Sequence, residues 1–185
     1  YVLQAGTADA VSVTSGDVRG NRFGIWVNSG STAPVTIDSR SGQVLGVTDT
    51  GIFVRGRNID IRSAASRGGI EGIFAENDAG ILSIDSTAGD VSGGRNSGIN
   101  VFHYGTDATL RTGNVTGVTQ GIDLLSKATG AVTIDTTRGV VTGLTSIALS
   151  VRSYGTGLSV TTGSVRGALS GIRATNKPIE ISGIS

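Results

Sequence analysis

The sequence repeats the pattern Gly-x-Val-x-Gly six times at nearly even spacing. The central residues of these copies are Val18, Val44, Val91, Val115, Val141 and Val165, and a degenerate copy centred on Ser66 fills the one gap. Successive copies therefore lie 22 to 26 residues apart. A period of this length indicates one supersecondary unit that stacks on copies of itself, as in a solenoid.

Two further signals recur at the same period. One is a Gly-Ile pair, found at Gly24-Ile25, Gly51-Ile52, Gly72-Ile73, Gly98-Ile99, Gly121-Ile122 and Gly171-Ile172, with Ser146-Ile147 as the variant. The other is an alternation of apolar and polar residues, as in Val35-Thr36-Ile37-Asp38 and Val132-Thr133-Ile134-Asp135. Alternation at period two predicts half-buried strands. Each repeat thus holds three short strands, joined by turns rich in Gly, Ser, Asn and Thr.

Three strands per turn, over about seven turns, predict an all-β fold: a right-handed parallel β-helix in which residues 1–185 form a single domain. No segment shows the i, i+3, i+4 apolar spacing of a helical solenoid. Neither end carries a recognisable polar cap, and the pattern stops at Ser185 partway through an eighth turn. We therefore expect the chain to be a piece of a longer solenoid.

The fourth residue of the alternating run carries charges of alternating sign on successive turns. This charged ladder consists of Asp38, Arg62, Asp85, Arg111 and Asp135. Opposite charges on neighbouring strands stabilise a sheet, whereas like charges destabilise it. The alternation therefore predicts that these five residues are stacked in register, with arginines holding the aspartates ionised and paired.

Composition excludes several classes of function. The net charge of +1 offers no basic field for nucleic acid, and the longest apolar run is too short to insert into a membrane. The absence of cysteine excludes disulfides and thiolate metal sites. The Gly-Gly-x-Gly-x-Asp calcium repeat is missing, and glycine-rich stretches precede strands rather than helices. We therefore expect no metal and no cofactor.

The sequence contains no recognisable catalytic motif. There is no Gly-x-Ser-x-Gly elbow, and a Ser-His-Asp triad would have to use His103, the only histidine. Nothing near His103 marks a nucleophile, so we expect an exposed loop histidine. Two uninterrupted carboxylates on adjacent turns would suggest glycoside or polysaccharide cleavage, but arginines separate the aspartates of the charged ladder. The prediction is a chain without enzymatic activity.

The residues that follow each Gly-Ile isoleucine are the best candidates for binding. If the isoleucines point inward, the outward column reads Trp26, Phe53, Phe74, Asn100, Asp123, Ala148 and Arg173. Three aromatic side chains on consecutive turns form an apolar stripe, which either binds a partner or a stacked sugar, or is covered or simply stabilises the stack. The longest loops after these strands, 102–108 and 152–157, each hold a Tyr-Gly-Thr sequence. The candidate binding residues are Trp26, Phe53, Phe74, His103, Tyr104 and Tyr154.

The repeat resembles the passenger domains of bacterial autotransporters, in particular those of large α-proteobacterial surface proteins. The resemblance lies in turns such as Val132–Gly139 followed by Val141-Thr142-Gly143, then Gly-Ile and a Gly/Ser/Thr turn, and it covers essentially the whole chain. It implies type V secretion and display outside the cell, at the bacterial surface. The implied role is that of an adhesin or structural stalk whose partners are a host-cell or matrix protein, a surface glycan, or other copies of itself. The alternative is a carbohydrate-binding or carbohydrate-cleaving β-helix.

Overall fold

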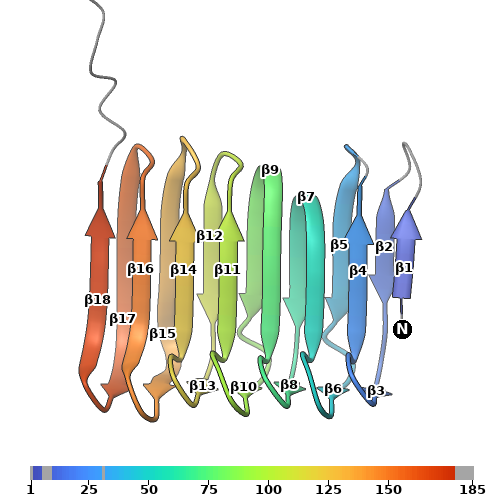
Figure 1. The fold of residues 1–185 in the computed structure, drawn as a ribbon, viewed down its shortest axis with the longest axis horizontal. Helices are drawn as coiled ribbons and strands as arrows, with labels where there is room; N and C mark the ends of the chain where they lie inside the picture. The colour runs from blue at the N-terminus through green and yellow to red at the C-terminus, as the bar shows by residue number, and fades with distance from the viewer. Residues whose placement is uncertain (1, 6–9, 31, 178–185) are drawn as a thin grey trace, which may run out of the picture.

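The strands wind into a right-handed parallel β-helix, as the repeat predicts. The computed structural model describes residues 2–5, 10–30 and 32–177, and this part of the chain contains strands and no helix. In Figure 1 the strands at the front run upward, those behind run downward, and successive turns advance from right to left. This path is a right-handed coil.

Each of the three sequence signals forms one face of the β-helix, on which every strand pairs in parallel with its equivalents one turn away. The Gly-Ile face holds β1 (Val2–Ala5), β4 (Ile25–Ser29), the first parts of β7 (Ile52–Ser63) and β9 (Ile73–Ser86), β11 (Ile99–His103), β14 (Ile122–Ser126), β16 (Ile147–Ser153) and β18 (Ser170–Asn176). The alternating face holds β2 (Val11–Thr14), β5 (Pro34–Ser39), the second parts of β7 and β9, β12 (Ala108–Thr112), and the first parts of β15 (Ala131–Gly143) and β17 (Gly157–Gly167). The Gly-x-Val-x-Gly face holds β3 (Val18–Gly20), β6 (Val44–Gly46), β8 (Ser66–Gly68), β10 (Val91–Gly93), β13 (Val115–Gly117) and the last parts of β15 and β17.

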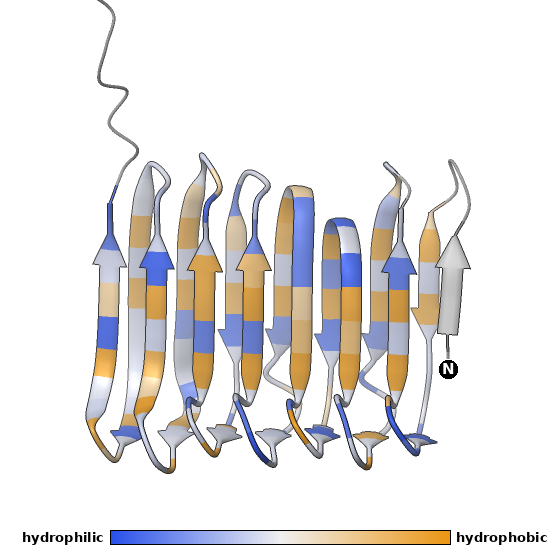
Figure 2. Ribbon diagram, viewed as in Figure 1, coloured by the Kyte–Doolittle hydropathy of each residue, from blue (hydrophilic) through white to orange (hydrophobic). Residues whose placement is uncertain are grey.

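The core is a set of stacked columns, because equivalent residues lie in register from turn to turn. Ile52 pairs with Ile73, and Ile73 with Ile99, and all three are fully buried. Phe74, the next residue after Ile73, faces outward and is half-buried. The inward and outward assignment is therefore confirmed here, and Figure 2 shows the resulting orange and blue bands along the strands.

Some corners of the coil have no loop, contrary to the expectation that turns separate all three strands. Strands β7 and β9 pass without a break from the Gly-Ile face to the alternating face, and β15 and β17 do so at the next corner. The only described residues with positive φ, Asn58 (47°) and Gly80 (73°), lie where β7 and β9 bend. A left-handed residue lets the backbone change direction without extra residues.

The prediction that Ala148 belongs to the outward column is wrong. Leu149, not Ile147, pairs with Ile122, so that Ala148 takes the place of the recurring glycine and is fully buried. Ser150 is the residue in register with Asp123. The physical reason is the length of the turn. Ile147 lies four positions after Gly143, whereas on the other turns the first inward residue of the Gly-Ile face lies five or six positions after the corresponding glycine.

Candidate functional site

Aromatic side chains on neighbouring turns stack on the Gly-Ile face. Trp26 pairs with Phe53, and Phe53 with Phe74, in the register that the sequence predicts. The ring centroids of Trp26 and Phe53 are 6.1 Å apart with planes at 14°, and those of Phe53 and Phe74 are 4.9 Å apart with planes at 5°. All three side chains are half-buried. The rings thus lie on the outside of the β-helix, where they also contact one another.

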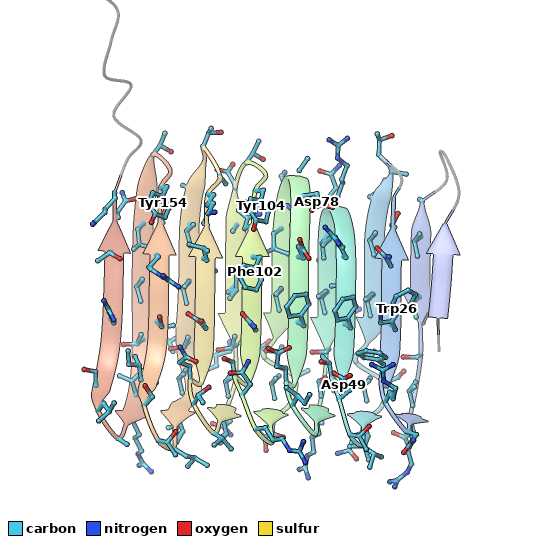
Figure 3. All side chains as sticks on the ribbon, in the orientation of Figure 1. Trp26, Asp49, Asp78, Phe102, Tyr104 and Tyr154 are labelled. Carbon is cyan, nitrogen blue, oxygen red and sulfur yellow. The ribbon has the colours of Figure 1, made fainter. Side chains whose placement is uncertain are left out.

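Two phenylalanines that the sequence reasoning missed extend this surface. The ring of Phe23 lies 5.6 Å from that of Phe53, and the ring of Phe102 lies 5.9 Å from that of Phe74. The aromatic stripe is therefore formed by Phe23, Trp26, Phe53, Phe74 and Phe102, which are all four phenylalanines and the single tryptophan of the chain. Figure 3 labels Trp26 and Phe102 toward its two ends. The signal for Phe102 was present: it is the next outward residue after Asn100 in β11.

His103 is not an exposed loop residue. It ends β11, points inward after Ile99 and Val101, and is 1% exposed. Its Nδ1 accepts a hydrogen bond from Asn77 Nδ2 at 3.0 Å, and its Nε2–H donates to the Thr106 carbonyl at 3.2 Å. Burial lowers the pKa of His103, although the Thr106 carbonyl and the charge of Asp107 act in the opposite direction. His103 is therefore a neutral structural residue rather than a surface binding residue.

Tyr104 and Tyr154 lie at the corner that follows the Gly-Ile face. They occupy equivalent places two turns apart, since each donates its backbone N–H to the carbonyl one turn below, that of Asn77 and that of Ser126. Tyr104 is 43% exposed, and Lys127 Nζ lies 5.9 Å from its ring centroid. Among the described residues, no ring contact joins either tyrosine to the aromatic stripe. The predicted binding residues thus fall into two surface groups and one buried position.

A buried glutamate beside the aromatic stripe is a feature that the sequence reasoning did not find. Glu71 precedes the Gly72-Ile73 pair and is 7% exposed. Its Oε1 accepts hydrogen bonds from Asn96 Nδ2 at 2.8 Å and Asn100 Nδ2 at 2.7 Å. Burial raises the pKa of Glu71, and the two amide hydrogen bonds offset only part of this effect.

Two more carboxylates act on Glu71 through their charge. The charges of Asp49 and Asp123 both help to raise its pKa. Asp49 pairs with Arg22 at 3.2 Å, whereas Asp123 Oδ1 is buried and has no hydrogen-bond partner among the described residues. The three acids come from different turns, at positions 22 and 52 residues apart, so no local motif marks them. We call Glu71, Asn96, Asn100 and Asp123 the Glu71 cluster.

The charged ladder lies on the alternating face in the predicted register. Its closest side-chain contacts run along the strand rather than between turns: Arg40 Nη2 lies 2.6 Å from Asp38 Oδ2, and Arg62 Nη2 lies 3.0 Å from Asp60 Oδ2. The hydrogen bonds from Arg40 lower the pKa of Asp38 to about 2. Close pairing of the ladder residues with one another is therefore wrong, although their stacking is right.

Carboxylates of the charged ladder also line a shallow depression of about 350 Å³, together with Thr87, Arg111 and Arg138. Partial burial acts to raise the pKa of Asp85, but hydrogen bonds from Thr87 and the nearby arginines outweigh it and lower that pKa. The backbone N–H and hydroxyl of Thr137 lower the pKa of Asp135. Neither carboxyl is therefore suited to act as a general acid near neutral pH.

Other candidate sites and the comparisons with known proteins add no assignment. Within residues 10–30 and 32–177, no three His, Asp or Glu side chains gather as a metal ion would require. The described residues contain no helix of the length and apolarity needed to cross a membrane. No protein-family model, no curated protein and no solved structure matches this sequence.

Proposed function

We propose that this chain is a segment of a secreted bacterial surface protein of the autotransporter passenger type, and that it acts as an adhesive surface on a rigid stalk, without catalysis. The observation that carries the proposal is the aromatic stripe. Every phenylalanine and the tryptophan of an otherwise aromatic-poor chain meet on one face of the coil. Aromatic anchors supply much of the binding energy when a partner removes them from water.

The stalk part of the proposal rests on the uniform stacking of the turns. Each inner turn pairs on all three faces with the turns before and after it, and stacked columns of buried aliphatic residues run along the axis. Such a solenoid resists bending and holds surface residues at fixed spacing. The partners we propose are a host-cell or matrix protein, a surface glycan, or a second copy of the chain.

Adhesion measured with stripe variants tests this proposal. Serine at both Trp26 and Phe53 should lower attachment of beads coated with the protein to cultured cells, or reduce self-association in analytical ultracentrifugation. Thermal stability should fall only modestly, because both side chains are half-buried on the outside. Serine at both Leu144 and Leu169, which are 57% and 77% exposed on turns nearer the C-terminus than the aromatic stripe, is the matched control.

Adhesion that falls equally in the two double variants would reject the aromatic stripe as the contact surface. Unchanged adhesion and self-association in the stripe variant, combined with a large loss of thermal stability, would show that the rings only stabilise the stack.

A second candidate function, a carbohydrate-cleaving β-helix, is favoured by one observation. Burial raises the pKa of Glu71, and the charges of Asp49 and Asp123 act in the same direction. A protonated carboxylic acid beside an ionised one is the arrangement that glycoside cleavage uses. Release of reducing ends from polysaccharides by the wild type, and its loss in Glu71→Gln, would establish this activity. No release by the wild type would leave the adhesive function in place.

A further inference from the structure

The aromatic stripe ends where hydrogen-bonding side chains begin, in a single outward column. Phe74 pairs with Asn100, and Asn100 with Asp123, on strands β9, β11 and β14. Neighbouring strands of a sheet lie about 4.8 Å apart, so an apolar ring, an amide and a carboxylate follow one another in regular steps. A ligand lying along the axis would therefore meet an apolar surface first and polar groups next.

Glu71 flanks this column at the position that Phe23 occupies two turns closer to the N-terminus. Phe23 precedes Gly24-Ile25, and its ring contacts that of Phe53 on the following turn. Glu71 precedes Gly72-Ile73, and its Oε1 binds Asn100 on the following turn. Its side chain therefore lies beside Phe74 and Asn100, at the edge of the aromatic stripe.

Two carboxylate oxygens of the Glu71 cluster have no hydrogen-bond partner among the described residues. Both hydrogen bonds of Glu71 go to Oε1, which leaves Oε2 without a hydrogen-bond partner among the described residues. Asp123 Oδ1 is unpartnered and shielded from solvent. Glu71 and Asp123 thus keep hydrogen-bond acceptor capacity that the described protein does not use, which suits a ligand that donates hydrogen bonds.

The charges at this place disfavour an anionic ligand. The charges of Asp49 and Asp123 both act on Glu71, and the guanidinium of Arg22 is already paired with Asp49. A ligand that combines an apolar face with several hydroxyl donors, and that carries no negative charge, fits both halves of the site. Neutral sugars have this chemistry, because a pyranose ring presents a C–H face and a rim of hydroxyl groups.

We propose that a neutral glycan binds along the Gly-Ile face, where the aromatic stripe meets the Glu71 cluster; this inference rests on the adhesive function and names its ligand class. One sugar residue packs against Phe74 and Phe102. Hydroxyls of the next residue donate to Glu71 Oε2 and to the carboxylate of Asp123. Asn96 and Asn100 hold the carboxyl of Glu71 in place.

A binding assay with immobilised oligosaccharides of known charge tests the proposal. The probes are neutral hexose and N-acetylhexosamine oligomers, uronic-acid oligomers, and an oligolysine peptide. Biolayer interferometry with the wild type should give binding to at least one neutral oligomer and none to the uronic-acid oligomers. Asp123→Ala should weaken that binding by about tenfold or more, since it removes a hydrogen bond to a charged group.

Asp123→Ala breaks no hydrogen bond within the described protein at Oδ1, so it should fold normally, which circular dichroism can verify. Asp60→Ala, which removes an outward carboxylate from the alternating face, is the matched control and should bind as the wild type does.

Equal binding by Asp123→Ala and the wild type, or preference for uronic-acid oligomers, would overturn the proposal. Binding of oligolysine alone, lost in Asp123→Ala, would identify a basic peptide as the ligand instead. If no neutral oligomer binds while the Trp26 and Phe53 double variant still loses adhesion, the glycan inference fails and the adhesive function stands. If the wild type does not adhere at all, the adhesive function itself fails.

Discussion

Truncation of one buried isoleucine should destabilise the β-helix more than truncation of the aromatic ring next to it. Ile73 is fully buried between Ile52 and Ile99. Ile73→Ala removes three buried carbons, each worth about 0.8 kcal/mol, or about 2.4 kcal/mol of transfer free energy. The neighbouring turns are held by their own strand pairing and cannot close the gap, so the residual cavity should bring the total to about 3–4 kcal/mol.

Phe74→Ala is the matched comparison, one residue away on the opposite side of the same strand. It removes the ring contacts with Phe53 at 4.9 Å and with Phe102 at 5.9 Å, each worth roughly 0.5–1.5 kcal/mol. Because the ring is already partly in water, we expect a total loss of about 1–2 kcal/mol, below that of Ile73→Ala.

Urea unfolding followed by circular dichroism measures both free energies. The midpoint of Ile73→Ala should lie clearly below that of Phe74→Ala, at similar slopes. If the two variants unfold at the same urea concentration, or if Phe74→Ala is the less stable, the inward and outward assignment of this strand is wrong.

Four other substitutions test separate features. Because burial lowers the pKa of His103 below 6.5, the unfolded chain takes up a proton first as the pH falls, so stability should decrease on acidification below about 6.5; His103→Ser should flatten this part of a thermal-melt profile. The pKa of Glu71 is raised above 4.5, so protonated Glu71 contributes its full stabilisation to the fold below that pH, and this stabilisation is lost as the pH rises. Glu71→Gln should remove this loss and have a higher melting temperature than the wild type at pH 7. Gly98→Ala should cost about 1–3 kcal/mol in urea unfolding, since its Cβ would lie 2.5 Å from a valine methyl and 2.8 Å from a backbone carbonyl. Arg62→Glu should lower the urea midpoint more than Arg62→Gln, with a difference that shrinks in high salt, because it places an acidic side chain between two aspartates of the charged ladder.

Much of the fold could be predicted because a solenoid uses the same local geometry in every turn. The alternation around Ile73 and Phe74 predicts which side chain faces the core, and stacking in register gives the equivalent residues on the next turn the same orientation. The register of the charged ladder follows in the same way. The outward position predicted for Ala148 is wrong, because the changed turn length before Ile147 shifts the alternation of inward and outward residues.

His103 could have been placed from the sequence, but the length of its strand was not apparent. Ile99, Val101 and His103 continue one alternation, so the histidine is inward if the strand extends that far. A histidine beside Tyr-Gly-Thr is equally typical of a loop. The hydrogen bond to Asn77, which lies 26 residues earlier, is what keeps the ring inside.

The sequence by itself determined the class of fold, the three faces and the outward position of Trp26, Phe53 and Phe74, because each depends on periodicity within one turn and on its repetition. The tertiary structure alone decided that Phe23 and Phe102 join the aromatic stripe and that Glu71 meets Asn96, Asn100 and the charge of Asp123. These contacts join residues 25 to 52 positions apart, near corners where turn lengths vary. The repeat pattern cannot predict these contacts, since they depend on where the variable turns place each side chain relative to the neighbouring turn.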